Sequence, residues 1–239
     1  MKPTAITLRS WVTAGVLLCA ASAPASGQFM DLPSAPPETA EPRSTHAYGD
    51  GWRLQACRNA YGARDYVMVE DACTPLAEKG EPEAQRLLGM TYLAGYGVAD
   101  RDRRAEKWIR AAAEAGDANA QLTLGTMYLH GQAVTRLDSI AASWIAKAAE
   151  QGLPEAQESL AYMYLVGQGV KKTPDRAVFW YERAAEKQHT PAMYNLGVLY
   201  YKGQVVARNT DKALELLRRA AALGHVEAQK TLEFIDPRR

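Results

Sequence analysis

The chain has 239 residues and carries 28 Lys and Arg against 27 Asp and Glu, a formal net charge of +1. A balance this close to neutral argues against binding to nucleic acid or to an anionic membrane surface, both of which select for an excess of basic residues. We therefore expect neither as a partner.

Residues 1–27 have the features of a secretory signal peptide. Lys2 and Arg9 supply a positive start, residues 11–21 form an apolar core, and small side chains offer a cleavage site near residues 25–27. The apolar run is too short to span a bilayer. We expect a periplasmic or secreted protein with no transmembrane segment after signal cleavage.

Cys19 raises an alternative, the attachment of a lipid at the end of the apolar core. That modification requires a small residue just before the cysteine, and Leu18 is bulky. Cleavage without lipid attachment is therefore the preferred interpretation.

Residues 28–47 are expected to form a disordered, Pro-rich tether. They are rich in Pro, Ser, Glu and Thr and contain few apolar side chains. Such a segment cannot bury enough surface to offset the entropy lost on ordering.

Two cysteines, Cys57 and Cys73, remain after cleavage. An even number of cysteines in an oxidising compartment predicts a disulfide, and Gly62 between them indicates a turn that joins two antiparallel helices. Residues 48–80 are thus expected to form an N-terminal capping helical pair closed by this bridge. Two buried free thiols are the alternative.

The chain then repeats itself every 36 residues, without insertions. The clearest columns of identical residues are Ala84, Ala120, Ala156, Ala192 and Ala228; Leu88, Leu124, Leu160, Leu196 and Leu232; Tyr92, Tyr128, Tyr164 and Tyr200; and Trp108, Trp144 and Trp180. A fixed period of this length indicates a solenoid. Four repeats are predicted at 81–116, 117–152, 153–188 and 189–224, followed by a C-terminal capping helix at 225–239.

Each repeat is expected to contain two helices. Ala84, Leu88 and Tyr92 have helical spacing, as do the residues that follow Ala105. Asp117 and Thr190 are candidate N-caps of first helices. A column of small residues beside the leucines, glycine in three repeats and alanine in one, would let the two helices of a pair approach closely.

The third repeat carries the most complete motif. It reads Ala156-Gln157, Leu160-Ala161, Tyr164, Gly167-Gln168-Gly169-Val170, Asp175-Arg176-Ala177, Trp180-Tyr181 and Ala184-Ala185-Glu186. This motif resembles the Sel-one-like repeat (SLR), a relative of the tetratricopeptide repeat, and the resemblance covers residues 81–224. It implies an all-α fold, an α-solenoid in which antiparallel helix pairs form a right-handed superhelix.

Four positions depart from this motif. Ala133 and Val205 replace the second loop glycine of repeats two and four, Gln188 replaces the closing glycine of repeat three, and Leu216 replaces the tryptophan of repeat four. These changes affect the expected shape of single loops and leave the expected fold unchanged.

The family resemblance implies a non-enzymatic protein-protein interaction adaptor or scaffold of the bacterial cell envelope, with a protein or peptide partner. A purely structural spacer is one alternative. An envelope hydrolase is another, because cysteine-rich relatives have been labelled β-lactamases. The Ser-x-x-Lys motif of that chemistry is missing from this chain.

No catalytic residue, metal or cofactor is expected. The chain contains no GxSxG, CxxC or HExxH motif. Its four histidines are His46 in the tether, His130 at a helix end, and His189 and His225 at equivalent positions of the repeat. This periodic placement favours a structural role for the last two.

The resemblance also implies where a partner binds, because in tetratricopeptide relatives the first helix of each pair lines the concave face. The positions that map onto this face are Arg86, Met90, Leu93, Leu122, Thr126, Leu129, Glu158, Tyr162, Leu165, Tyr194, Val198, Tyr201 and Lys202. Tyr and Arg are enriched at interface hot spots. The leading candidates for partner contacts are therefore Arg86, Tyr162, Tyr194 and Tyr201.

Overall fold

We analysed a computed structural model, in which residues 50–95 and 100–236 are described. They belong to one structural unit, residues 46–239. The predicted signal peptide and tether lie outside the described residues.

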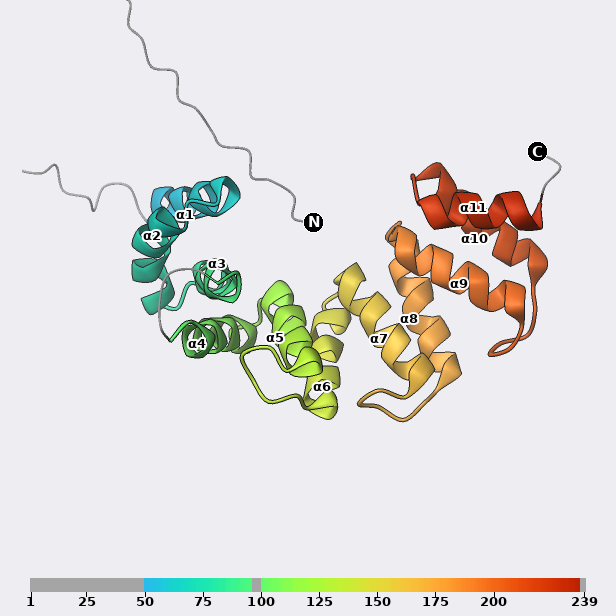
Figure 1. Ribbon diagram of the computed structural model, residues 1–239, viewed down its shortest axis with the longest axis horizontal. Coiled ribbons are helices and arrows are strands. Elements are labelled where there is room, and N and C mark those ends of the chain that lie inside the picture. Colours follow the sequence, from blue (N-terminus) through green and yellow to red (C-terminus); the bar gives the residue numbers. More distant parts are fainter. Residues whose placement is uncertain (1–49, 96–99, 237–239) are drawn as a thin grey trace, which may run out of the picture. The chain divides into compact units, whose positions relative to one another are not determined.

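The described residues form eleven α-helices and no strand, which confirms the predicted all-α solenoid. The helices are α1 (Gly51–Ala63), α2 (Tyr66–Glu78), α3 (Pro82–Leu93), α4 (Arg101–Glu114), α5 (Ala118–His130), α6 (Asp138–Glu150), α7 (Pro154–Val166), α8 (Pro174–Glu186), α9 (Thr190–Lys202), α10 (Thr210–Ala222) and α11 (Val226–Ile235). Each helix packs against the next in chain order, so successive helix pairs stack side by side (Figure 1).

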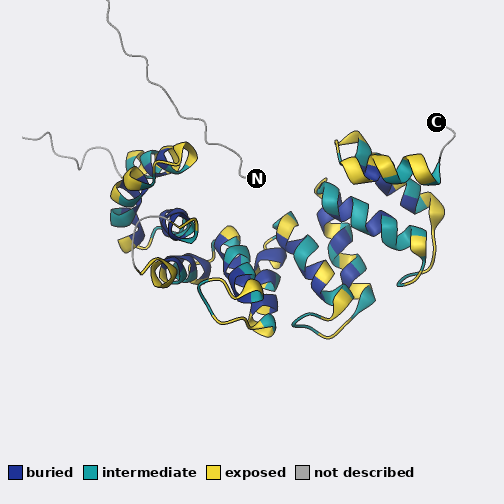
Figure 2. Cartoon of the chain, in the orientation of Figure 1, coloured by how far each residue is buried: buried dark blue, intermediate teal, exposed yellow. Residues whose placement is uncertain are grey.

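The periodic alanines and leucines form the core between stacked helices. The alanine column is completely buried from Ala84 to Ala228, and the leucines from Leu88 to Leu196 are at most 1% exposed. Figure 2 shows this buried stripe running through the middle of the array, with exposed residues on the outer turns. The columns therefore hold the repeats together, as a solenoid requires.

The small-residue column sets the distance between the two helices of a pair. A Cβ atom added at Gly125 in α5 would lie 2.5 Å from Cγ1 of Ile145 in α6 and 3.0 Å from the carbonyl oxygen of Ala141. Glycine permits this approach because it has no side chain. In the third repeat the residue is Ala161, and the residue that corresponds to Ile145 is Tyr181.

Arginine and lysine side chains donate hydrogen bonds to the hydroxyl groups of the tyrosine column. In repeats one, three and four, a basic residue twelve positions further along donates to the tyrosine hydroxyl: Arg104 to Tyr92 (3.3 Å), Arg176 to Tyr164 (3.0 Å) and Lys212 to Tyr200 (2.9 Å). In repeat two that position is Ile140, and Arg110 of the preceding repeat donates to Tyr128 instead, at 2.7 Å. The tyrosines that recur in each repeat thus join helices to one another.

Buried glutamines next to the alanine column also join neighbouring repeats. Each donates from Nε2 to the carbonyl oxygen of an alanine near the end of the preceding second helix: Gln85 to Ala77 (3.0 Å), Gln121 to Ala113 (3.0 Å) and Gln157 to Ala149 (3.1 Å). The last carbonyls of a helix have no partner within it. The glutamines therefore satisfy part of the demand at each helix end.

The N-terminal helical pair is closed by the predicted disulfide between Cys57 of α1 and Cys73 of α2, whose Cα atoms lie 5.2 Å apart. Both cysteines are fully buried. The turn lies two residues later than Gly62 suggested, because α1 continues to Ala63 and Arg64 takes the left-handed conformation, with φ 58°. Asp65 then caps α2 by accepting a hydrogen bond from the Met68 amide at 3.1 Å.

One of the two predicted N-caps is confirmed and the other is wrong, and two of the loop substitutions keep a positive φ. Asp117 caps α5 by accepting from the Ala120 amide at 2.7 Å, as predicted. The prediction for Thr190 is wrong, since Thr190 is the first helical residue and His189 occupies the cap position. Ala133 retains the positive φ of the glycine it replaces, 61°, and so does Gln188, also at 61°.

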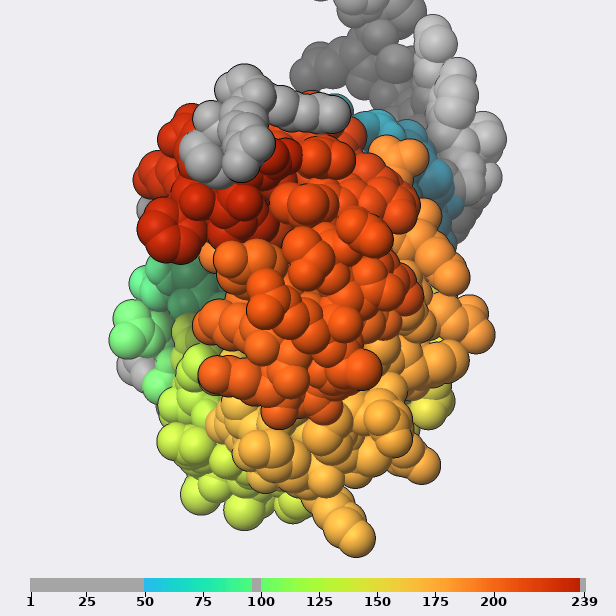
Figure 3. Space-filling model, turned by 90° about the vertical axis from the view of Figure 1, so that its right-hand side faces the viewer, coloured from blue at the N-terminus to red at the C-terminus, as the bar shows by residue number. Residues whose placement is uncertain are grey.

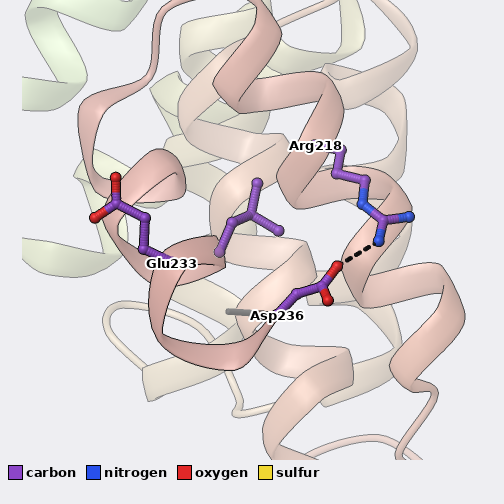
Figure 4. A pocket seen from close by; sticks show the side chains of 4 residues that line it. Arg218, Glu233 and Asp236 are labelled. Carbon is purple, nitrogen blue, oxygen red and sulfur yellow. Dashed lines mark hydrogen bonds and ion pairs between the residues drawn. The ribbon is translucent and has the colours of Figure 1, made fainter. Parts of the chain in front are cut away.

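The last described helix, α11, packs on α10, as α5, α7 and α9 pack on the second helix that precedes them. Figure 3 shows these C-terminal residues in red and orange, in contact with one another. Asp236 occupies the tyrosine-column position and pairs with Arg218 of α10 at 2.6 Å (Figure 4). Beside them lies a pocket of about 340 Å³ whose lining includes Leu232 and Glu233. Glu233 stands in the small-residue column, so a further helix could not approach here as α6 approaches α5.

Candidate protein-interaction face

Charge is distributed unequally between the two helices of a repeat. The first helices carry few charges: α5 contains no Asp, Glu, Lys or Arg, α9 contains only Lys202, and α3 and α7 contain two such residues each. Among the second helices, α6 contains three, α8 and α10 contain five each, and α4 contains eight. The outward side chains of α3, α5, α7 and α9, here called the first-helix face, therefore form the less strongly hydrated side of each repeat.

Side-chain contacts on this face join the first helices of neighbouring repeats at two places. Arg86 of α3 pairs with Asp117 at the start of α5, with Nε 3.1 Å from Oδ2. Asn195 of α9 donates to Glu158 of α7 at 3.0 Å.

A pocket of about 380 Å³ opens between α5 and α7 on this face. Its lining residues are Thr126, Leu129, His130, Arg136, Ile145, Glu158, Ser159, Tyr162, Met163 and Gln168. Of the thirteen predicted positions, the structure thus brings four together here. We call this pocket the α5/α7 pocket.

Glu158 is half-buried in the α5/α7 pocket. Burial raises the pKa of its carboxyl above the ordinary value, although the field of His189 and the hydrogen bond from Asn195 both act to lower it. Burial also raises the pKa of Tyr181, which lies close enough to Glu158 and Tyr162 for their charges to add to the effect. The carboxyl of Glu158 is therefore partly shielded from water.

Tyr162 is the most exposed of the predicted aromatic residues, with 51% of its surface accessible. Val166, one turn further along α7, is 46% exposed. Residues four apart on a helix are neighbours, so Glu158, Tyr162 and Val166 form one row on α7. This row presents a carboxylate, an aromatic ring and an aliphatic group to solvent.

Arg86 lies at the predicted place but is occupied by intramolecular contacts. Its side chain is 17% exposed and pairs with both Asp117 and Glu83. It also contacts the Met90 sulfur, with Nη1 3.9 Å from Sδ. Its guanidinium thus connects two repeats and is poorly placed to meet a partner.

The remaining predicted residues lie outside the α5/α7 pocket. Tyr194 stacks on His225 with ring centroids 4.8 Å apart, and His225 itself caps α11 by accepting from the Ala228 amide at 3.2 Å. The Arg208 guanidinium lies over the Tyr201 ring, 5.5 Å from its centroid. Leu122, Val198 and Lys202 are on α5 and α9 but do not line the pocket.

Sequence reasoning missed two kinds of residue. His130, Arg136 and Gln168 line the α5/α7 pocket from helix ends and loops, where the repeat columns give no guide to direction. Phe234 of α11 is 83% exposed and falls in the column of Tyr162, two repeats later. Extending that column beyond the fourth repeat would have found it.

Other kinds of site are not apparent in residues 50–95 and 100–236. These residues contain no group of three or more His, Cys, Asp and Glu side chains placed to hold a metal ion. In the same residues, none of the helices combines the length and the apolar character needed to cross a membrane.

Comparison with known proteins agrees with the repeat analysis. The Sel1 repeat pattern matches four consecutive segments, residues 82–117, 118–153, 154–189 and 190–225. The chain belongs to the Sel1 repeat family. No curated protein matches it.

Solved Sel1 repeat structures resemble it closely. A Sel1 repeat protein from Oxalobacter formigenes is 31% identical, with a TM-score of 0.68 over 74% of this chain and 70% of that one. The protein c5321, a protective antigen of uropathogenic Escherichia coli with an SLR fold, is 34% identical, with a TM-score of 0.66 over 69% of this chain. This Sel1 repeat chain covers only 35% of c5321.

A third structure shares the fold alone. The immunity protein PA5088 from Pseudomonas aeruginosa is 21% identical and has a TM-score of 0.51 over 74% of this chain and 67% of that one.

Proposed function

We propose that this Sel1 repeat protein is a non-enzymatic adaptor of the bacterial cell envelope that binds a protein or peptide partner on its first-helix face. The observation that carries the proposal is the near absence of charge from α5 and α9, whereas the second helices carry three to eight charged residues each. Depletion of charged residues with retention of aromatic ones is typical of the core of protein interfaces. Sel1 repeats serve as scaffolds for protein interaction, which supports the same proposal.

A purified partner tests this proposal through a triple variant, Tyr162→Ala, Tyr194→Ala and Tyr201→Ala. The partner is first isolated by native affinity purification of the exported protein and then produced separately. Loss of one hot-spot side chain costs about 2 kcal/mol or more, so the partner's affinity is expected to fall at least about tenfold, measured by calorimetry.

The matched control is Phe179→Ala in α8. Phe179 is 45% exposed, comparable to Tyr162, but belongs to a second helix. Its loss is expected to leave the affinity unchanged. Unchanged affinity in the triple variant, with a normal melting temperature, would reject the first-helix face as the binding surface.

We further propose that the protein acts in the periplasm or outside the cell, after removal of residues 1–27. The buried Cys57–Cys73 disulfide fits an oxidising compartment. Fractionation of cells that produce the full chain, followed by N-terminal sequencing, is expected to give a mature protein starting near residues 26–28. Recovery of the uncleaved chain in the cytoplasm would contradict this proposal.

A further inference from the structure

The α5/α7 pocket contains a carboxylate without an ionic partner. Among the described residues Glu158 makes no ion pair, and its one hydrogen bond is from the neutral Asn195 amide. The other strong charge of the lining, Arg136, is already paired with Asp138 at 2.8 Å. Glu158 thus carries the uncompensated charge of the pocket.

The surroundings of Glu158 leave this charge exposed to a partner. Asn195 and His189 face it from α9 and its cap, and Tyr181 faces it from α8. His189 is the only basic group among them, and within the described residues it makes no ion pair or side-chain hydrogen bond with Glu158, whose one hydrogen bond is with Asn195. A carboxylate partly removed from water gains more from a cation than a fully hydrated one does.

Tyr162 is the second group of the pocket that would attract a cationic side chain. Its ring lies one helical turn from Glu158 and is half exposed. A cation near an aromatic face is attracted by the ring, and the aliphatic stem of a lysine or arginine side chain covers apolar surface well. Val166 extends this apolar surface along α7.

We infer that the α5/α7 pocket receives a lysine or arginine side chain from an extended segment of the partner. The cationic group pairs with Glu158, and the stem of the side chain lies against Tyr162. This inference rests on the proposed function and specifies the chemistry of the partner.

Synthetic peptides test the inference without knowledge of the natural partner. Four pools of nine-residue peptides share the same randomised flanks and differ in the central residue, which is Lys, Arg, Gln or Glu. Binding to the full mature chain is measured by fluorescence anisotropy. We expect the Lys and Arg pools to bind at least about tenfold more tightly than the Gln pool, since charge-assisted hydrogen bonds are the stronger kind, and the Glu pool to bind most weakly.

The variant Glu158→Gln should abolish the preference for Lys and Arg, and the matched control Glu155→Gln should retain it. Glu155 lies on the same helix but is exposed to water. Equal binding of the Lys, Arg and Gln pools, binding of none of them, or a preference that survives Glu158→Gln would each overturn the inference.

The variants distinguish a failure of the proposed function from a failure of the inference about a basic residue. If the purified partner loses affinity in the triple tyrosine variant but not in Glu158→Gln, the first-helix face binds it and the basic-residue inference is wrong. If the triple variant binds the partner normally, the proposed function is wrong. Melting curves of each variant establish that it is folded.

Discussion

At the scale of single residues, the most regular polar groups of this chain join neighbouring helices. Gln85, Gln121 and Gln157 each reach back to a carbonyl at the end of the preceding second helix. In the fourth repeat the same position is Met193, which is fully buried. The repeat therefore accepts an apolar residue here, at the cost of one hydrogen bond.

This comparison predicts the effect of Gln157→Met. The substitution preserves the approximate volume of the side chain and removes the bond from Gln157 Nε2 to the Ala149 carbonyl, which keeps its bond from the Gly152 amide at 2.9 Å. It also removes the buried Oε1 atom of Gln157, which has no hydrogen-bond partner. Because the two effects offset each other, the free energy of unfolding measured with urea should change by no more than about 1 kcal/mol. A loss of about 3 kcal/mol or more would contradict this comparison.

Glu158 predicts a dependence of stability on pH. Its pKa in the folded chain lies above that in the unfolded chain, so the folded state binds its proton more tightly, and ionisation as the pH rises through this window destabilises the fold. Glu158→Gln should therefore be more stable than the natural protein at pH 7 and should lose that advantage at pH 3, below both pKa values. Chemical denaturation at the two pH values measures the difference, and an advantage that is equal at both would contradict the assignment.

At the scale of helices, the approach of the two members of a pair depends on glycine. Gly125→Ala would place a Cβ atom 2.5 Å from the Ile145 side chain, and overpacking of this kind costs about 1–3 kcal/mol. Gly62→Ala in α1 is the matched control, because a Cβ atom there meets nothing within 4 Å and alanine favours a helix. The control should be neutral or stabilising, and equal loss of stability in both variants would contradict the packing account.

The N-terminal helical pair depends on its disulfide. The bridge joins residues 16 apart in sequence, and closing a loop of that length stabilises by about 3 kcal/mol in the chain-entropy view. The double variant Cys57→Ser and Cys73→Ser should lose amide protection in α1 and α2 first, while α7 to α10 stay protected, since repeats interact mainly with their neighbours. Uniform loss of protection along the chain would show that the pair is not a separate cooperative unit.

The helices could be predicted from the sequence because each column of the repeat faces the same neighbour in every copy. The register of Ala84, Leu88 and Tyr92 therefore fixed both the helix and its buried side. Arg86 shows where this reasoning stops. Its partner Asp117 occurs at that position in one repeat only, so the periodic pattern could not predict this ion pair. The pair occupies the Arg86 guanidinium and makes Arg86 a poor candidate for partner contacts.

The α5/α7 pocket could be predicted only in part, for a related reason. Thr126, Glu158 and Tyr162 lie on first helices, where the helical period gives their direction. Arg136 and Gln168 reach the pocket from connections between helices, and the direction of a loop side chain depends on tertiary contacts that no periodic pattern records.

At the scale of the whole described unit, the second helices of the repeats carry three to eight charged residues each and the first helices carry none to two. The first helices expose Tyr162 and Val166, and α11 exposes Phe234, while Ile140 and Phe179 are the exposed large apolar residues of α6 and α8. An exposed apolar surface of this kind is expected to bind another molecule. In α11, Glu233 takes the place of the small residue and Asp236 that of the tyrosine, where it pairs with Arg218.

Site-specific photo-crosslinking tests this division most directly. A benzophenone amino acid is placed at Tyr162 in α7 or, in a separate strain, at Phe179 in α8, and the exported protein is irradiated in intact cells and analysed by mass spectrometry. The account predicts a defined adduct with one partner protein from position 162 and none from position 179. Adducts that form equally from both positions, or only from position 179, would contradict the claim that the first-helix face is the binding surface.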